Sequence, residues 1–147
     1  MNFAQQLTFP LLLALAFGST QAMAQAKADS IAVVCSASCT YSPLSREDVE
    51  SAWSGRKSNE SLRGAELWDL PEPNPAQGLF LSKALSKDSA QYRAMWAKNV
   101  FNGKGRPPRV APDEEALMKT LGENPSAIGY MSQAAAEKKG LKILASF

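Results

Sequence analysis

Basic side chains gather in one stretch of this chain, where they are suited to holding negative charge. Lys98, Lys104, Arg106 and Arg109 follow one another with no Asp or Glu between them. Such a cluster is either a solvated loop that aids solubility or a positive rim that attracts an anion or an acidic partner. The whole chain is nearly balanced, with 16 Lys and Arg against 14 Asp and Glu, so we do not expect a nucleic-acid-binding protein.

Cys35 and Cys39 offer a second kind of chemistry. A Cys-x-x-x-Cys segment closes a small disulfide if the loop turns back on itself. A redox role is the alternative, although the spacing differs from the Cys-x-x-Cys motif whose thiolate is activated at a helix start. Free or intermolecular thiols are a third possibility that the spacing leaves open.

Histidine is absent from the chain. Its absence removes the commonest zinc ligand, the usual general base and the serine-type catalytic triad. No paired-carboxylate motif replaces it. We therefore expect a protein that is not an enzyme, with no metal site and no cofactor.

Short strands and helices alternate along the sequence. β-branched and apolar runs predict strands at 30–35, 65–70, 126–131 and 141–144. Cap residues and helical spacing predict helices that begin near residues 45, 74, 88, 112 and 134. The fold class is therefore α/β, with a small mixed sheet flanked by helices in a single lobe.

The first residues have the pattern of a secretory signal peptide. An apolar run, Phe9 to Phe17, is too short to span a bilayer, and small residues that suit cleavage follow it. We expect a signal peptide at 1–24, with cleavage after residue 26 as an alternative, and one domain at 27–147. The product would lie in the periplasm and would not be embedded in the membrane.

Two segments in the second half of the chain resemble a known family. WAKNVFNGKGRPPR, at 96–109, is a tryptophan-bearing helix end that runs into a Gly/Lys/Arg/Pro loop, and SAIGY follows at 126–130. In this order they resemble the phosphate-type periplasmic substrate-binding proteins of ABC transporters, the type 2 family. Leu44-Ser45-Arg46-Glu47, Trp53 to Lys57 and Leu70-Pro71 also resemble segments of that family.

The resemblance implies a binding protein that holds phosphate with backbone N–H groups and hydroxyls at helix starts. The segment that carries these groups in the family is Asp69 to Gln77 here, and it lacks the Arg, the Gly pair and the Ser/Thr of the family pattern. Asp69 and Glu72 add negative charge that repels phosphate. The remaining candidate ligand residues are Ser36, Ser38, Asn74, Ala76, Gln77 and Tyr130, with Lys104, Arg106 and Arg109 as a basic loop.

Each candidate also has an ordinary structural interpretation. Asn74 is a typical helix N-cap, Ser36 and Ser38 are typical loop hydroxyls, and Tyr130 is typical of a core edge. Three hypotheses follow: an exported module that binds phosphate or another small anion weakly, an interaction module on the same fold, and a thiol–disulfide protein. The partners would be a small anion, an ABC permease or another periplasmic protein.

Overall fold

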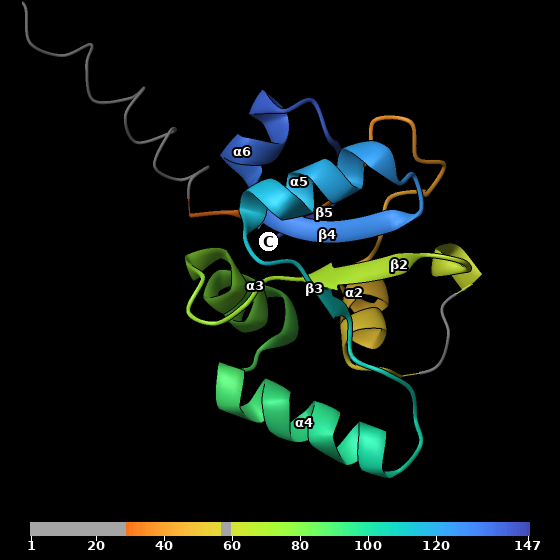
Figure 1. Ribbon diagram of the computed structural model, residues 1–147, viewed down its shortest axis with the longest axis vertical. Helices are drawn as coiled ribbons and strands as arrows, with labels where there is room; N and C mark the ends of the chain where they lie inside the picture. Colours follow the sequence, from red (N-terminus) through yellow and green to blue (C-terminus); the bar gives the residue numbers. More distant parts are fainter. Residues whose placement is uncertain (1–28, 57–59) are drawn as a thin grey trace, which may run out of the picture.

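The computed structural model describes residues 29–56 and 60–147 (Figure 1). The expected signal peptide and both of its cleavage points lie outside these residues. The strands are β1 (Ile31–Cys35), β2 (Glu66–Asp69), β3 (Arg109–Val110), β4 (Ala127–Ser132) and β5 (Lys142–Ser146). The α-helices are α2 (Arg46–Trp53), α3 (Pro75–Leu85), α4 (Ser89–Phe101), α5 (Glu114–Glu123) and α6 (Gln133–Lys138), and a 3₁₀ turn spans Glu60–Leu62.

The strands form one mixed sheet in the order β3-β2-β4-β1-β5. β1 is antiparallel to both β4 and β5, whereas β2 is parallel to β3 and β4. The predicted α/β class and the mixed sheet are confirmed. β1 and most of β4 are buried, as expected for central strands that are covered on both faces.

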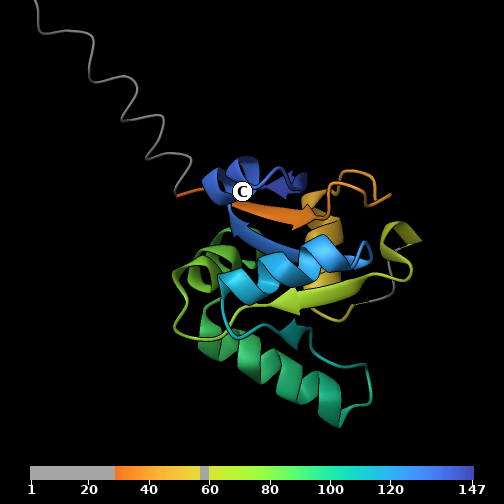
Figure 2. The same ribbon diagram turned by 45° about the horizontal axis from the view of Figure 1, so that its top comes forward.

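Side chains of β4 show which helices cover each face of the sheet. Tyr130 is fully buried and stacks on Phe80 of α3, with the ring centroids 4.0 Å apart, and Trp53 of α2 packs edge-on against both rings. The neighbouring Gly129 faces the opposite way, where a Cβ would come within 2.9 Å of Leu117 in α5. Helices α2 and α3 therefore lie on one face and α5 on the other (Figure 2).

The caps that predicted the helices are present. Ser45 and Asp48 form a capping box at the start of α2, and Asp88 and Gln91 form another at the start of α4. The Asn74 side chain caps α3, whose first residue is Pro75. These caps satisfy backbone N–H groups that have no partner inside the helix, so each fixes where a helix begins.

The structure departs from the sequence analysis at the end of α4 and just beyond it. Val100 and Phe101 fall at apolar helical positions, yet they are 53% and 91% exposed. The two-residue strand β3 was not predicted, since such a short pairing with β2 leaves no periodic pattern to detect. Among the described residues, no helix is long and apolar enough to cross a membrane.

Candidate functional site

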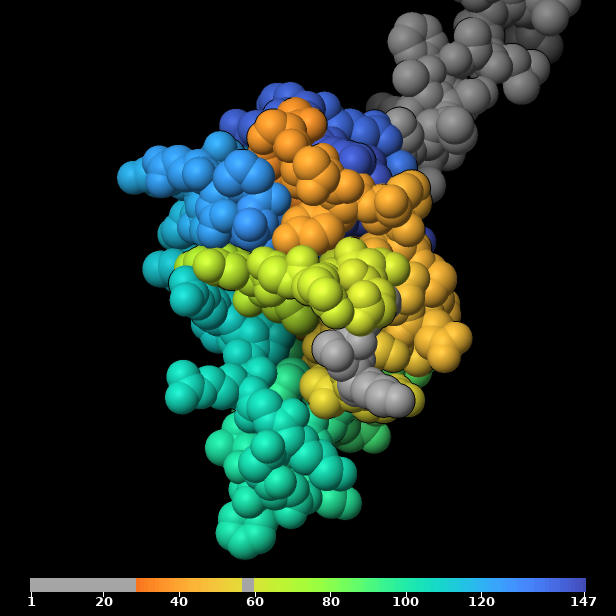
Figure 3. All heavy atoms as spheres, turned by 90° about the vertical axis from the view of Figure 1, so that its right-hand side faces the viewer, coloured from red at the N-terminus to blue at the C-terminus, as the bar shows by residue number. Residues whose placement is uncertain are grey.

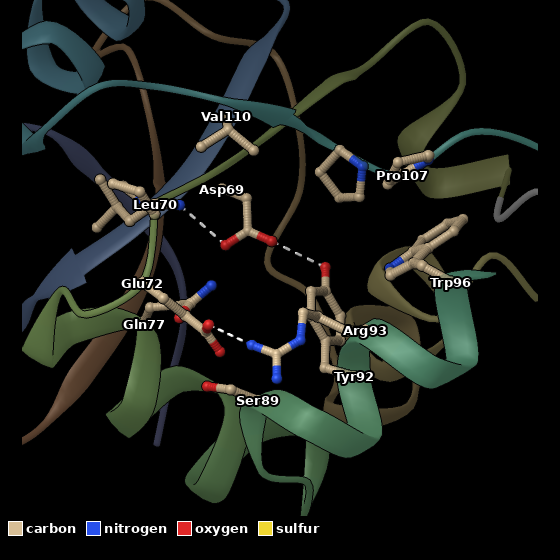
Figure 4. Close-up of a pocket in the computed structure, with 12 residues that line it drawn as sticks. Asp69, Leu70, Glu72, Gln77, Ser89, Tyr92, Arg93, Trp96, Pro107 and Val110 are labelled. Carbon is tan, nitrogen blue, oxygen red and sulfur yellow. Dashed lines mark hydrogen bonds and ion pairs between the residues drawn. The ribbon is translucent and has the colours of Figure 1, made fainter.

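A pocket of about 360 Å³ opens where β2 ends and α3 begins. We call it the β2-edge pocket. Its walls come from the β2–α3 connection, from one face of α4 and from the loop that leads into β3 (Figure 4). It is lined by Asp69, Leu70, Pro71, Glu72, Gln77, Ser89, Tyr92, Arg93, Trp96, Pro107, Pro108 and Val110.

The Asp69 carboxylate lies at the bottom of the pocket and is almost completely buried, with 4% of the residue exposed. Its Oδ1 accepts hydrogen bonds from the Tyr130 hydroxyl and from the Leu70 N–H, the latter at 2.9 Å. Its Oδ2 accepts a hydrogen bond from the Tyr92 hydroxyl, also at 2.9 Å (Figure 4). The Leu70 N–H is shared with the Tyr130 hydroxyl oxygen at 3.1 Å. Three donors therefore converge on this carboxylate.

Burial dominates the proton affinities in this network. Loss of solvent raises the pKa of Asp69 above its usual range, and the hydrogen bonds from Tyr130, Tyr92 and Leu70 counteract only part of that rise. Burial also raises the pKa of both tyrosines, and the nearby Asp69 charge raises it further. Both hydroxyls therefore stay protonated at neutral pH and act as donors.

The rim of the pocket carries further polar groups. The Arg93 guanidinium forms an ion pair with the Glu72 carboxylate, and both side chains are partly exposed. Gln77 is 8% exposed and lines the pocket from the first turn of α3, and Ser89 lines it from the start of α4. The pocket therefore combines a buried carboxylate, a paired arginine and an amide with largely apolar walls.

The six predicted ligand residues do not converge on one site. Ser36 and Ser38 follow β1, which is antiparallel to β4, whereas Asn74 follows β2, which is parallel to β4. The serines therefore lie at the opposite end of the sheet from the start of α3 (Figure 1). Their hydroxyl oxygens lie 2.8 Å apart, and Ser36 Oγ accepts the Ser38 N–H, as in an ordinary loop.

The donors at the start of α3 are already used. The Ala76 N–H donates to Asn74 Oδ1 at 2.8 Å, and the Gln77 N–H donates to the Asn74 carbonyl at 3.1 Å. Tyr130 donates its hydroxyl hydrogen to Asp69. An anion at this helix start would have to displace these bonds. Of the six predicted residues, Gln77 lines the β2-edge pocket and Tyr130 contacts it through its hydrogen bond to Asp69.

The basic loop divides into two parts. Arg109 lies 3.2 Å from the Glu66 carboxylate and over the Trp68 ring, so it stabilises the β2–β3 edge. Lys104 and Arg106 are exposed, and neither forms an ion pair with an acid in the described ranges. Lys104 and Arg106 are therefore the part of the basic loop whose charges are not paired within the described residues.

A second concave region lies against the opposite face of α4, between the end of α2 and the loop after α4. We call it the basic hollow. It is an open depression with a volume of about 610 Å³ and is lined by Ser54, Arg56, Lys87, Gln91, Ala94, Met95, Lys98, Asn99 and Lys104. The C-terminal end of α4 and the following loop project from the body of the molecule (Figure 3). No carboxylate is among its lining residues.

The sulfur atoms of Cys35 and Cys39 are at disulfide distance, as the first of the three cysteine interpretations predicts. Both residues are buried, with 0% and 6% exposed. Lys142 Nζ donates to the carbonyls of Cys39 and Tyr41, which fixes the same loop from outside. These contacts are those of a structural link in a loop.

Sequence reasoning missed Asp69 and Tyr92 as members of a site. Asp69 was interpreted only as a negative charge that repels phosphate, and Tyr92 was not among the predicted ligand residues. One available signal was an Asp that follows Leu67 and Trp68 at the end of a strand, because a buried carboxylate must find donors. The strand pairing that brings Tyr130 beside it cannot be read from either segment alone.

The comparisons with known proteins support the fold. No protein-family model matches the chain, and no curated protein matches it. Among solved structures, an ABC-type phosphate transport receptor from Vibrio cholerae superposes with a TM-score of 0.55 at 13% sequence identity. The match covers 78% of this chain and 45% of the receptor, so the chain spans less than half of that protein. The chain is thus similar in fold to part of a phosphate transport receptor, as the sequence resemblance had implied.

Proposed function

We propose that this chain is an exported, non-enzymatic binding module and that the β2-edge pocket is its ligand site. The buried Asp69 carboxylate at the bottom of a pocket is the observation that carries this proposal. Pockets with mostly apolar walls and a few fixed polar groups are the usual form of small-molecule sites. The fold is also that of part of a phosphate receptor.

The ligand of this pocket differs from free phosphate in its charge. Asp69 and Glu72 both line the pocket, and a phosphate dianion beside them meets like charge in a partly dehydrated space. Phosphate and other small anions therefore bind here weakly. Asp69 Oδ2 accepts one hydrogen bond, from Tyr92, and retains a free lone pair. A small neutral or cationic molecule with an N–H or O–H donor suits that lone pair.

A binding role also fits the state of the titratable groups. The raised pKa of Tyr92 and Tyr130 disfavours the phenolate form that a nucleophile or base would need. The Asp69 carboxylate is enclosed by three donors, which hold it in one position. The network is arranged to hold a ligand in place.

Titration calorimetry tests the pocket. The purified protein is titrated with inorganic phosphate, sulfate, small carboxylates and a panel of small amines and polyols. We expect measurable binding of a neutral or amine ligand and much weaker binding of phosphate. Gln77→Ala removes a lining amide and should weaken that binding, whereas the control Lys119→Ala on α5 should not. If no compound in the panel gives a measurable binding heat, the ligand proposal is wrong and only the similarity in fold remains.

Export is tested separately from binding. Periplasmic fractionation, followed by mass spectrometry of the mature N-terminus, should give a chain that begins at residue 25 or 27. A full-length chain in the cytoplasm would contradict this. Export also suits a Cys35–Cys39 disulfide, because disulfides persist in oxidising compartments.

A second candidate function is protein interaction, and the exposed end of α4 favours it. Phe101 is 91% exposed, and Val100 beside it is 53% exposed. Exposed apolar side chains on a projecting element are common anchors for a partner. The partner would be an ABC permease or another periplasmic protein. Pull-down with the wild type and with Phe101→Ser tests this, and a partner retained equally by both would place the contact elsewhere.

A further inference from the structure

The strongest unassigned feature is the cluster of cations in the basic hollow. Arg56, Lys87, Lys98 and Lys104 come from four separate segments: the end of α2, the α3–α4 turn, the last turn of α4 and the loop after it. No Asp or Glu occurs from residue 89 to residue 112. The fold therefore brings like charges together at one place, and that costs stability unless something opposes them.

Of the four cations, Arg56 forms an ion pair with a described acid. Glu50 Oε2 lies 4.0 Å from Arg56 Nη2, at the limit of an ion pair. Asp88 is engaged in the α4 capping box, where it accepts the Gln91 N–H at 2.8 Å. Neither Glu50 nor Asp88 lines the hollow. Lys98 and Lys104 thus have no carboxylate partner among residues 29–56 and 60–147.

The floor of the hollow is held in place by hydrogen bonds. Asn99 Nδ2 donates to the Ser54 carbonyl at 2.9 Å and joins α4 to the end of α2. The Lys104 N–H donates to the Asn99 carbonyl at 2.9 Å, so the loop returns toward the same point. Ser54 is buried, with 6% exposed. The backbone positions of the cations are therefore set before any ligand arrives.

We propose that the basic hollow is a binding site for a small polyanion, a molecule that carries at least two phosphate or carboxylate groups. A single exposed Lys contributes little to binding an anion, because water and salt screen it. Several cations that act together on one multivalent ligand give a useful affinity. The arrangement therefore favours ligands with several negative charges over ligands with one. The site lies on the opposite face of α4 from the β2-edge pocket and does not depend on the ligand of that pocket.

Calorimetry with tripolyphosphate and citrate tests the proposal. At low ionic strength the purified protein should bind both, orthophosphate should bind more weakly, and affinity should fall steeply as salt is added. Lys98→Gln with Lys104→Gln should weaken tripolyphosphate binding about tenfold. The control, Lys138→Gln with Lys139→Gln at the C-terminal end of α6, removes the same charge from exposed positions elsewhere and should leave the affinity nearly unchanged.

Three results would overturn the proposal. The first is no binding of either polyanion at low salt. The second is an equal loss of affinity in the α6 control, which would mean a non-specific response to net charge. The third is binding to anionic vesicles, or to an acidic protein, with none to tripolyphosphate and citrate. Amide shifts of α4 residues in an NMR titration would support the site directly.

Discussion

The β2-edge pocket and the basic hollow lie against opposite faces of α4. Tyr92 and Trp96 point from the helix toward the pocket, whereas Gln91 and Lys98 line the hollow. One region has a buried carboxylate at its bottom, and the other has four cations at its surface. A single helix thus separates an acidic interior site from a basic exterior one.

The two regions differ in what holds their charges in place. The Asp69 carboxylate is fixed by three donors in an almost dry environment, so its charge and its neighbours depend strongly on one another. The cations of the hollow are on long side chains in water, and each can be changed with little effect on its neighbours. The pocket should therefore respond to substitution through folding stability, and the hollow through binding and ionic strength.

Asp69→Ala should produce the largest effect. It leaves the hydroxyls of Tyr92 and Tyr130 buried without their acceptor, and the Leu70 N–H keeps only its bond to the Tyr130 hydroxyl oxygen. This should cost about 3–5 kcal/mol of unfolding free energy. Urea unfolding followed by circular dichroism measures it. The matched substitution Lys98→Ala in the hollow should stay within about 0.5 kcal/mol. A loss below about 1 kcal/mol in Asp69→Ala would contradict a network of this kind.

Tyr130→Phe should come next. The ring keeps its stacking on Phe80, but Asp69 loses one donor and Leu70 loses a shared acceptor, so we expect a loss of about 2–3 kcal/mol. Tyr92→Phe removes a single hydrogen bond and should cost less, about 1–2 kcal/mol. The same unfolding assay ranks the two variants, and the reverse order would show that Tyr92 is the more important donor.

Gly55→Ala tests the contact that separates the two regions. Gly55 has φ of +62°, and an added Cβ would lie 2.8 Å from Trp96, whose side chain lines the pocket. We expect a loss of about 2–3 kcal/mol from backbone strain and steric overlap together. Gly64 has φ of +80°, and an added Cβ would have no neighbour within 4 Å. Gly64→Ala therefore measures the cost of backbone strain alone, which should be about 1 kcal/mol of unfolding free energy. Equal losses in thermal unfolding would mean that Trp96 moves aside freely.

The pH dependence of stability distinguishes the buried carboxylate from the exposed charges. The folded pKa of Asp69 is raised, so the folded state holds its proton to higher pH than the unfolded state does. The contribution of Asp69 to stability is therefore greatest below its ordinary pKa of 3.8 and is lost as pH rises through the folded pKa. Between the unfolded and the folded pKa of Asp69, the unfolding free energy of the wild type should fall relative to that of Asp69→Asn. The total loss should be about 1.4 kcal/mol for each unit by which the two pKa values differ. If the difference in unfolding free energy between the two proteins does not change with pH, the raised pKa of Asp69 is contradicted.

Local sequence signals predicted much of the fold but little of the site. Capping residues and apolar runs were sufficient for α2, α3, α4 and the longer strands, because each depends on interactions within a few residues. The Asp69 network joins residues 23 and 61 positions apart in sequence, so it depends on strand pairing and helix docking. The exposure of Phe101 was not predicted, because helical spacing identifies the apolar face of a helix but does not show how far along the helix neighbouring elements cover that face.

The smallest predicted effect concerns salt and the hollow. Four clustered cations repel one another in the folded state, and salt screens that repulsion over a Debye length of about 10 Å at 0.1 M. Raising salt from about 10 mM to about 1 M should therefore stabilise the wild type by a few tenths of a kcal/mol more than it stabilises Lys98→Gln with Lys104→Gln. Urea unfolding at the two salt concentrations measures the difference, and the α6 control pair should behave like the wild type. If the control shows the same reduced response, repulsion is spread over the whole surface and the hollow is not a distinct basic site.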